Sequence, residues 1–426
     1  MEQSINKNSI FVSIASYRDD VCPETLSSLY EMANKPENIF VGICQQNKKE
    51  SQDKDCLDSI NNFKYKDNVR IKRILHTEAK GPTYARYICS TLYKNEEYYL
   101  QIDSHSKFVK DWDIKCINMI NEIKSLGLSK KPVLSHYPKE ISEHKDHKEN
   151  DTFLPRICKP FFNTRDMISF MGSEMIDSKG EYYITPFIAG GMMFCESYFL
   201  NELPYDPILP YIFVGEEILH SIRYYTHGWD IFTPKENIVF HEYTRAEKPK
   251  IWTDNPYYSD MDAFDKIRYI LGLDENDSKL KPEMKVDIDK YGLGKIRTLQ
   301  QYYDLTGIDI KNRSVKKNFC REGNIASDED IKKSNEKNWE ESDKEQNKEE
   351  ENKEEENKEK ENKEEKENKE ENKKENKNSI IKILNNYYET IMELKNYKLI
   401  LLVLIVISLI IAIILGYIIG CKLCGT

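Results

Sequence analysis

The sequence lacks the signatures of several large protein classes. Its first nine residues contain no apolar run, so we expect no secretory signal peptide. The formal net charge is -10 and no stretch is rich in both arginine and aromatic residues, so we expect no nucleic-acid partner. No strand-like run is followed by GxGxxG or GxxxxGK(S/T), which excludes the usual dinucleotide and P-loop sites.

The ten cysteines show no spacing typical of a disulfide framework. They are scattered, and most lie inside apolar runs, as Cys44, Cys89, Cys116 and Cys195 do. Disulfides persist mainly in oxidising compartments, whereas buried thiols in apolar runs are typical of cytosolic proteins. The sequence therefore predicts reduced thiols.

The C-terminal part of the chain differs sharply in composition from the rest. Residues 328–378 are almost entirely Lys, Glu, Asn and Asp, and with no apolar residue to bury they predict a solvated stalk. Residues 379–398 have helical apolar spacing and predict an amphipathic segment along a membrane surface. Residues 399–420 carry no charge and, at about 1.5 Å per residue, are long enough for a transmembrane helix.

The residues that flank this apolar run predict its orientation. Lys395 and Lys398 precede the run, and positively charged residues favour the cytosolic side of a membrane. Only six residues of the sequence follow residue 420, which indicates a tail anchor. We therefore expect a single-pass membrane protein whose catalytic domain faces the cytosol.

Apolar runs and helical patterns alternate along the N-terminal part of the chain. Strands are predicted at residues 9–17, 38–44, 69–75, 98–102 and 132–136. Helices are predicted at residues 23–32, 82–93 and 112–123, and further helices within residues 257–307. This alternation predicts an α/β domain over residues 1–325 with a mostly parallel central sheet. In such sheets, ligands bind at the carboxyl ends of the strands.

One predicted strand leads directly into two metal-binding residue types. The apolar run YYLQI is followed by Asp103-Ser104-His105. An Asp and a His two residues apart in extended chain can point to the same side and hold one divalent ion. The alternative is structural, because Asp also caps turns and His often satisfies a local hydrogen bond.

Downstream motifs resemble those of a known family. Residues 186–207 read PFIAGGMMFCESYFLNELPYDP and residues 214–243 read VGEEILHSIRYYTHGWDIFTPKENIVFHEY. Together with the Asp-Ser-His motif they resemble the polypeptide N-acetylgalactosaminyltransferases, which have the GT-A fold. The matching motifs occur in the same order, as Ala189-Gly190-Gly191, Tyr205-Asp206, Gly215-Glu216-Glu217 and His241.

The N-terminal motifs are similar to a sister family. Residues 11–30, FVSIASYRDDVCPETLSSLY, and residues 80–87, KGPTYARY, resemble the cytoplasmic enzymes that add N-acetylglucosamine to hydroxyproline of the adaptor Skp1. The resemblance covers about residues 9 to 245. It implies a GT-A fold and a UDP-sugar donor. Glu216-Glu217 replaces the Glu-Asn of the first family, which leaves the donor sugar open.

The resemblance also implies a set of site residues. His241, which follows the apolar run NIVF, would be the third ligand beside Asp103 and His105, and such a set suits Mn²⁺. Arg18 and Arg86 could face the nucleotide phosphates, although surface arginine is the commoner case. Glycines without a Cβ atom would let the donor approach the backbone, and the structural alternative is a turn. These glycines are Gly81, Gly190 and Gly191.

These observations predict a metal-assisted glycosyltransferase. It would move a sugar, with N-acetylglucosamine favoured, from a UDP-sugar to a hydroxyl of a protein, such as hydroxyproline, Ser or Thr. Both resembled families retain anomeric configuration, and Glu216, or else Glu217, would bind sugar hydroxyls. One alternative is an inverting transferase that builds a glycan or glycolipid at the membrane, with Glu216 or Glu217 as general base. Another is an inactive, membrane-tethered binding protein.

Overall fold

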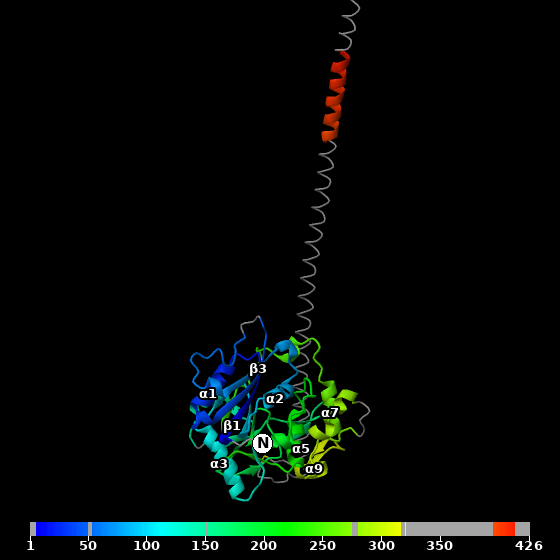
Figure 1. Cartoon of the computed structure of the whole chain (residues 1–426). Coiled ribbons are helices and arrows are strands. Elements are labelled where there is room, and N and C mark those ends of the chain that lie inside the picture. The colour runs from blue at the N-terminus through cyan, green and yellow to red at the C-terminus, as the bar shows by residue number, and fades with distance from the viewer. Residues whose placement is uncertain are drawn as a thin grey trace, which may run out of the picture. The chain divides into compact units, whose positions relative to one another are not determined.

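The computed structural model describes residues 6–49, 53–149, 151–274, 280–316, 320 and 395–413. The chain divides into two compact units, Met1–Asp343 and Lys344–Thr426, called here the N-terminal and C-terminal units (Figure 1). The described part of the N-terminal unit is a mixed α/β structure, and that of the C-terminal unit is one helix.

The main sheet of the N-terminal unit is mostly parallel. The neighbouring strands β4, β1, β2 and β3 run parallel to one another, as do β6 and β14. Strand β13 runs antiparallel between β4 and β6, and β12 pairs antiparallel with β14 at one edge. The order across the sheet is β12 (Tyr183–Ile184), β14 (Asp230–Thr233), β6 (Pro132–Ser135), β13 (Met192–Glu196), β4 (Glu96–Asp103), β1 (Asn6–Tyr17), β2 (Ile39–Asn47) and β3 (Val69–Leu75). The predicted α/β class with a mostly parallel sheet is confirmed.

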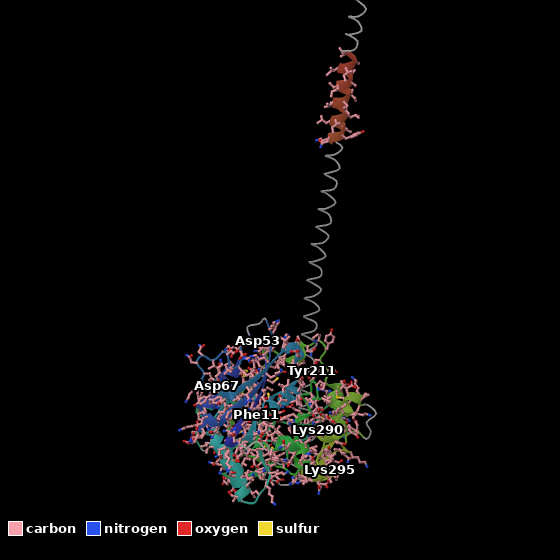
Figure 2. All side chains as sticks on the ribbon, in the orientation of Figure 1. Phe11, Asp53, Asp67, Tyr211, Lys290 and Lys295 are labelled. Atoms are coloured by element: carbon pink, nitrogen blue, oxygen red, sulfur yellow. A yellow bond between two sulfur atoms is a disulfide. The ribbon has the colours of Figure 1, made fainter. Side chains whose placement is uncertain are left out.

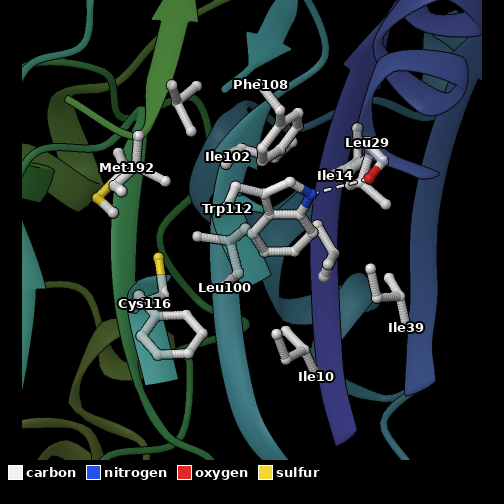
Figure 3. Packing of buried hydrophobic residues seen from close by; sticks show 14 of the residues in the cluster. Ile10, Ile14, Leu29, Ile39, Leu100, Ile102, Phe108, Trp112, Cys116 and Met192 are labelled. Carbon is white, nitrogen blue, oxygen red and sulfur yellow. Dashed lines mark hydrogen bonds between the residues drawn. The ribbon is translucent and has the colours of Figure 1, made fainter. Parts of the chain in front are cut away.

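Both faces of this sheet are buried, which explains the unbroken apolar run of β1. Ile10, Val12 and Ile14 pack on one face against α1 (Cys22–Glu31) and α3 (Trp112–Ser125). Phe11 points to the opposite face and packs in a second cluster. Figure 3 shows the Trp112 ring among the strand residues of the first cluster, with its indole N–H donating to the carbonyl oxygen of Leu29 at 2.8 Å. Successive strand side chains point to opposite faces, so both kinds of position must be apolar here.

Three helices from the later part of the N-terminal unit pack together. Helices α5 (Glu216–Thr226), α7 (Met261–Ile270) and α9 (Leu299–Thr306) share an apolar cluster and lie together in Figure 1. Lys266 of α7 is fully buried, and its ammonium group donates to Asp206 at 2.7 Å. This ion pair ties α7 to the segment that leads into α5. The helices expected within residues 257–307 are therefore present, and they pack on one another and on α5.

Shorter elements complete the N-terminal unit. Helix α2 (Pro82–Ser90) lies against β1 and β2. A small sheet contains β5 (Ser106–Phe108), β15 (Val239–His241) and β7 (Lys139–Glu140) in that order. The remaining strands pair as β8 (Phe153–Arg156) with β11 (Glu174–Asp177), β9 (Pro160–Phe162) with β10 (Ile168–Phe170), and β16 (Ile308–Asp309) with β17 (Ser314–Val315). The remaining helical segments are η1 (Pro36–Asn38), η2 (Lys66–Asn68), η3 (His76–Glu78), η4 (Ile141–Asp146), α4 (Phe199–Glu202), α6 (Ile251–Asp254), η5 (Pro282–Lys285) and α8 (Ile288–Tyr291).

The expectation of reduced thiols is wrong for two pairs of cysteines. Cys22 is bonded to Cys56, and Cys158 is bonded to Cys320. Their sequence separations of 34 and 162 residues give no local motif, but the fold brings their Cα atoms within 5.0 and 4.9 Å, a spacing that suits a disulfide. The cysteines first singled out within apolar runs do remain free and buried, namely Cys44, Cys89, Cys116 and Cys195.

The described helix of the C-terminal unit, Lys395–Ile413, is long and apolar enough to cross a membrane. At about 1.5 Å per residue its 19 residues extend about 28 Å. Length and composition alone are weak support for an anchor. Residues 414–420 of the predicted span lie outside the described residues, as do the predicted stalk at 328–378 and most of the amphipathic segment at 379–398.

Candidate functional site

Three residues that the sequence singled out converge at one end of the main sheet. Asp103 is the last residue of β4, His105 follows in the turn before β5, and His241 ends β15. Antiparallel pairing of β15 with β5 carries His241 from far along the chain to this edge. One ligand atom from each residue lies within 4.8 Å of the others. We call Asp103, His105 and His241 the cation site.

The donor atoms of the cation site suit a divalent metal ion. Nε2 of His241 lies 3.2 Å from Oδ2 of Asp103, and ligand atoms held at about 2.1 Å from one ion are about 3 Å apart. Burial by itself raises the pKa of Asp103, but His241 and the charge of Arg86 outweigh it and hold that pKa well below its usual range. A carboxylate and two imidazoles can therefore converge on one cation.

Asp19 holds His105 in an orientation suited to a ligand, and the sequence reasoning missed it. This carboxylate is almost fully buried and accepts hydrogen bonds from the Ser104 hydroxyl at 2.6 Å and from Nδ1 of His105 at 2.8 Å. A guanidinium nitrogen of Arg245 lies 3.2 Å from the same oxygen. If Nδ1 carries the proton, Nε2 of His105 is free to bind a metal. Carboxylates beside metal-binding histidines commonly fix the ring in this way. The only signal in the sequence was the place of Asp19 just after the first strand.

Arg86 forms the inner wall of the site. It is buried in α2 and donates to Oε1 of Glu216 at 2.7 Å, and less closely to Oδ1 of Asp103 at 3.3 Å. It also donates to the carbonyl oxygen of Gly190 at 3.0 Å. The second carboxylate oxygen of Glu216 accepts from the Thr83 hydroxyl at 3.1 Å. Arg86 thus couples the cation site to the start of α5.

Glu217 occupies a different environment from its neighbour Glu216. Its Oε1 accepts from the backbone N–H of Gly190 at 2.7 Å, and its Oε2 accepts from the Tyr137 hydroxyl at 2.6 Å. Burial is the main cause that raises the pKa of Glu217 to about 7. Its carboxyl group can therefore change protonation near neutral pH.

The two adjacent glycines lie close to side chains of the site. A Cβ atom at Gly190 would lie 2.9 Å from Oε1 of Glu216 and 3.2 Å from a guanidinium nitrogen of Arg86. A Cβ atom at Gly191 would lie 3.1 Å from Oδ2 of Asp103. The contact at Gly190 would force a side chain to shift, and the contact at Gly191 would be tight. The absence of Cβ atoms therefore lets the network around Asp103 and Glu216 form, whether or not a sugar also approaches here.

Arg18 and Gly81 have partners outside the cation site. Arg18 has a φ of 45° just after β1, and its guanidinium pairs with Asp53 at 3.0 Å and with Asp254 at 2.8 Å. Gly81 precedes α2 with a φ of 88°, and a Cβ atom there would lie 3.0 Å from the Cα of Tyr211. Asp53 and Tyr211 are labelled in Figure 2. These contacts account for both residues structurally, and their role toward a nucleotide stays a prediction.

The comparison with protein families identifies the chain. A family model described as Glycosyltransferase (GlcNAc) matches residues 9–64 and 59–312. The chain belongs to this glycosyltransferase family. The matched residues include every residue of the cation site together with Arg86, Glu216 and Glu217. The comparison with curated proteins gives no match.

Three solved structures of glycosyltransferases align with this family member. GalNAc-T7 with UDP, GalNAc and Mn²⁺ aligns at a TM-score of 0.50 and 14% identity, over 72% of this chain and 58% of that one. S. aureus TarS 1-349 with UDP-GlcNAc aligns at 0.40 and 12% identity, over 62% and 66%. The mannosyltransferase PcManGT of Pyrobaculum calidifontis with GDP-Man and Mn²⁺ aligns at 0.35 and 13% identity, over 62% and 61%. The chain thus spans little more than half the length of GalNAc-T7, and the likeness to GalNAc-T7 supports a GT-A-like fold alone.

Proposed function

We propose that this glycosyltransferase moves N-acetylglucosamine from UDP-N-acetylglucosamine to a hydroxyl of a protein, with retention of anomeric configuration. The observation that carries the proposal is the convergence of Asp103, His105 and His241 inside the region that matches the family. The buried Asp19 beside His105 adds the orienting carboxylate expected next to a metal ligand. GalNAc-T7, whose solved structure contains UDP, GalNAc and Mn²⁺, shares the fold.

The residues around the cation site have separate roles in this proposal. A divalent cation bound there supplies positive charge that stabilises the departing diphosphate. Arg86 holds Asp103 and Glu216 in place from the protein side. Glu216, already bound to Arg86 and Thr83, is the proposed partner of a sugar hydroxyl, and Glu217 fixes the backbone of Gly190.

Retention needs no carboxylate nucleophile in the form proposed here. The bond between the anomeric carbon and the phosphate oxygen breaks, the acceptor oxygen bonds to the same face, and its proton passes to the departing phosphate. Glu216 is held in an ion pair with Arg86, which disfavours a nucleophilic role.

A second candidate function is an inverting transferase. One observation favours it: the pKa of Glu217 near 7 suits a general base.

A donor panel tests the proposal directly. We expect the full chain in detergent with Mn²⁺ to release UDP from UDP-N-acetylglucosamine about tenfold faster than from UDP-N-acetylgalactosamine or UDP-glucose, because a well-placed polar contact is worth about 1.4 kcal/mol. Release of nucleotide is measured without an acceptor and then with a mixture of hydroxyproline, Ser and Thr peptides. The anomeric configuration of the product, determined by NMR, separates the retaining from the inverting reaction. No release from any donor would support the inactive, tethered protein.

The protonation of Glu217 gives a second test. The ionised carboxylate accepts hydrogen bonds from both Gly190 and Tyr137, so we expect kcat/KM to rise with pH through about 7. Glu217→Gln should flatten this rise and keep measurable activity if the residue only positions the backbone. A loss of roughly 10² to 10⁴-fold would instead indicate a general base and the inverting reaction. The measurement is a pH profile of kcat/KM for both proteins.

We also propose that the helix Lys395–Ile413 anchors the enzyme with its N-terminal side in the cytosol. Lys395 and Lys398 at the start of this helix favour that orientation. Among the cysteines that the structure describes, four free, buried thiols suit a reducing compartment, while two disulfides favour an oxidising one. The acceptors would then be cytosolic proteins near that membrane.

Protease accessibility decides the orientation. We expect protease added to sealed membrane vesicles to degrade the N-terminal unit and leave a short fragment that contains the anchor helix, because a cytosolic domain is exposed outside such vesicles. An antibody against the N-terminal unit follows its loss, and a luminal marker protein confirms that the vesicles are sealed. Protection of the N-terminal unit until detergent is added would contradict the cytosolic orientation.

A further inference from the structure

A cavity of about 340 Å³ adjoins the cation site, because Tyr243 in its wall contacts His241. Its wall is formed by Tyr137, Pro138, Lys139, Glu140, Glu143, Pro155, Gly172, Ser173 and Tyr243. The volume lies at the low end of the range for small-molecule pockets, about 300–1,000 Å³, so it suits a single side chain or one sugar ring.

Two tyrosines connect this cavity to the reaction site. The Tyr243 ring lies 4.3 Å from the ring of His241, centroid to centroid, and the Tyr137 hydroxyl donates to Glu217. The two tyrosines thus place the cavity next to both His241 and Glu217.

Glu140 is held beside the cation site by strand pairing. It is the register partner of His241 in the parallel pair formed by β7 and β15. Paired residues of neighbouring strands project from the same face, with the strands about 4.8 Å apart. The small sheet thus places the carboxylate of Glu140 in the cavity at a position one strand away from a metal ligand.

This carboxylate lacks a partner within the described residues. Oε2 of Glu140 is buried and makes no hydrogen bond there. The adjacent Lys139 does not neutralise it, because the Lys139 ammonium group pairs with Asp151 at 2.7 Å. Glu143, also in the cavity wall, adds a second negative charge. Because the buried oxygen Oε2 of Glu140 has no donor among the described residues, the cavity favours a ligand that brings a positively charged donor.

We propose that this cavity binds a lysine or arginine side chain of the acceptor polypeptide, next to the hydroxyl that receives the sugar. Glu140 would pair with the cation, and the half-exposed Tyr243 ring offers an aromatic face for a cation–π contact. This inference rests on the proposed transfer to a protein hydroxyl, and it names the acceptor class. A neutral sugar ring could stack on Tyr243 as well, but it would leave the charge of Glu140 uncompensated.

The test uses pairs of acceptor peptides that differ in one side chain. Each pair carries one Ser or hydroxyproline, with lysine or its neutral isostere norleucine at one position within three residues of it. For the full chain in detergent with Mn²⁺ and UDP-N-acetylglucosamine, we expect kcat/KM to be roughly tenfold higher for the best lysine peptide than for its norleucine partner. Raising the salt concentration should reduce this ratio.

Variants of Glu140 separate its charge from its place in the fold. Glu140→Gln should bring the ratio of kcat/KM for the two peptides close to one, and Glu140→Lys should favour a glutamate peptide instead. Glu283→Gln, which removes an exposed carboxylate in the 3₁₀ turn η5 (Pro282–Lys285), is the matched control and should keep the wild-type ratio. Thermal melts of each variant establish that it is folded.

Each other outcome overturns the inference in a distinguishable way. Equal kcat/KM for the two peptides of every pair contradicts the binding of a cationic side chain, and so does an unchanged ratio in Glu140→Gln. If sugar is still transferred to the peptides in these cases, the proposed function stands. A methyl glycoside that accepts sugar better than any peptide would assign the cavity to a glycan. Donor hydrolysis without transfer to any peptide would overturn both this inference and the protein acceptor.

Discussion

Replacing Asp103 by alanine is expected to reduce kcat for donor hydrolysis by about 1,000-fold or more. Lewis-acid stabilisation of a leaving group is worth several kcal/mol, and each 1.36 kcal/mol is tenfold in rate. Asp103 is the only carboxylate of the cation site, and it lies between His241 and Arg86. The side chain is partly solvent-accessible, so its loss should leave the fold intact.

Metal binding and folding are measured separately for this variant. Calorimetric titration with Mn²⁺ should show binding to the wild type and none to Asp103→Ala, while far-UV circular dichroism stays the same. Asp67→Ala, which removes an exposed carboxylate labelled in Figure 2, is the control and should bind and turn over as the wild type does. Full activity in EDTA, or an unimpaired Asp103→Ala enzyme, would contradict the metal assignment.

Replacing Arg86 by methionine is expected to destabilise the N-terminal unit by about 3–5 kcal/mol and to abolish measurable turnover. Removing one partner of a buried ion pair leaves the other charge uncompensated, which typically costs about 3–5 kcal/mol of stability. Arg86 and Glu216 are both almost fully buried, and their atoms lie 2.7 Å apart. The same substitution also releases Asp103 and the carbonyl oxygen of Gly190 from the guanidinium.

A double-mutant cycle separates the ion pair from the packing around it. Arg86→Met combined with Glu216→Gln should recover a large part of the lost stability, because the second change removes the uncompensated charge. Urea unfolding followed by circular dichroism gives the free energy for each variant. Lys290→Met, a control that removes an exposed cation of α8, should change stability by less than about 0.5 kcal/mol. Additive effects of the two site mutations would show that Arg86 and Glu216 are not coupled.

The elements of the main sheet were predictable because their signals are local. The strand expected at residues 69–75 matches β3 (Val69–Leu75), and the apolar run at residues 9–17 lies within β1 (Asn6–Tyr17). Helix α2 ends at Ser90, three residues before its predicted end. The antiparallel direction of β13 was not predicted, because a strand's apolar pattern is the same whichever way the chain runs.

The sequence by itself determined the family, the apolar runs that become buried strands, and the strand-end position of Asp103 and His105. Each of these depends on residue types close together in the chain. The resemblance had also placed His241 beside Asp103, 138 residues away, and the structure brings the two together. Only the tertiary structure decided that Asp19 meets His105 across 86 residues and that Arg86 meets Glu216 across 130. It also decided the disulfides that composition had argued against. Such pairs depend on how strands and helices far apart in the chain are packed against one another, which no local pattern encodes.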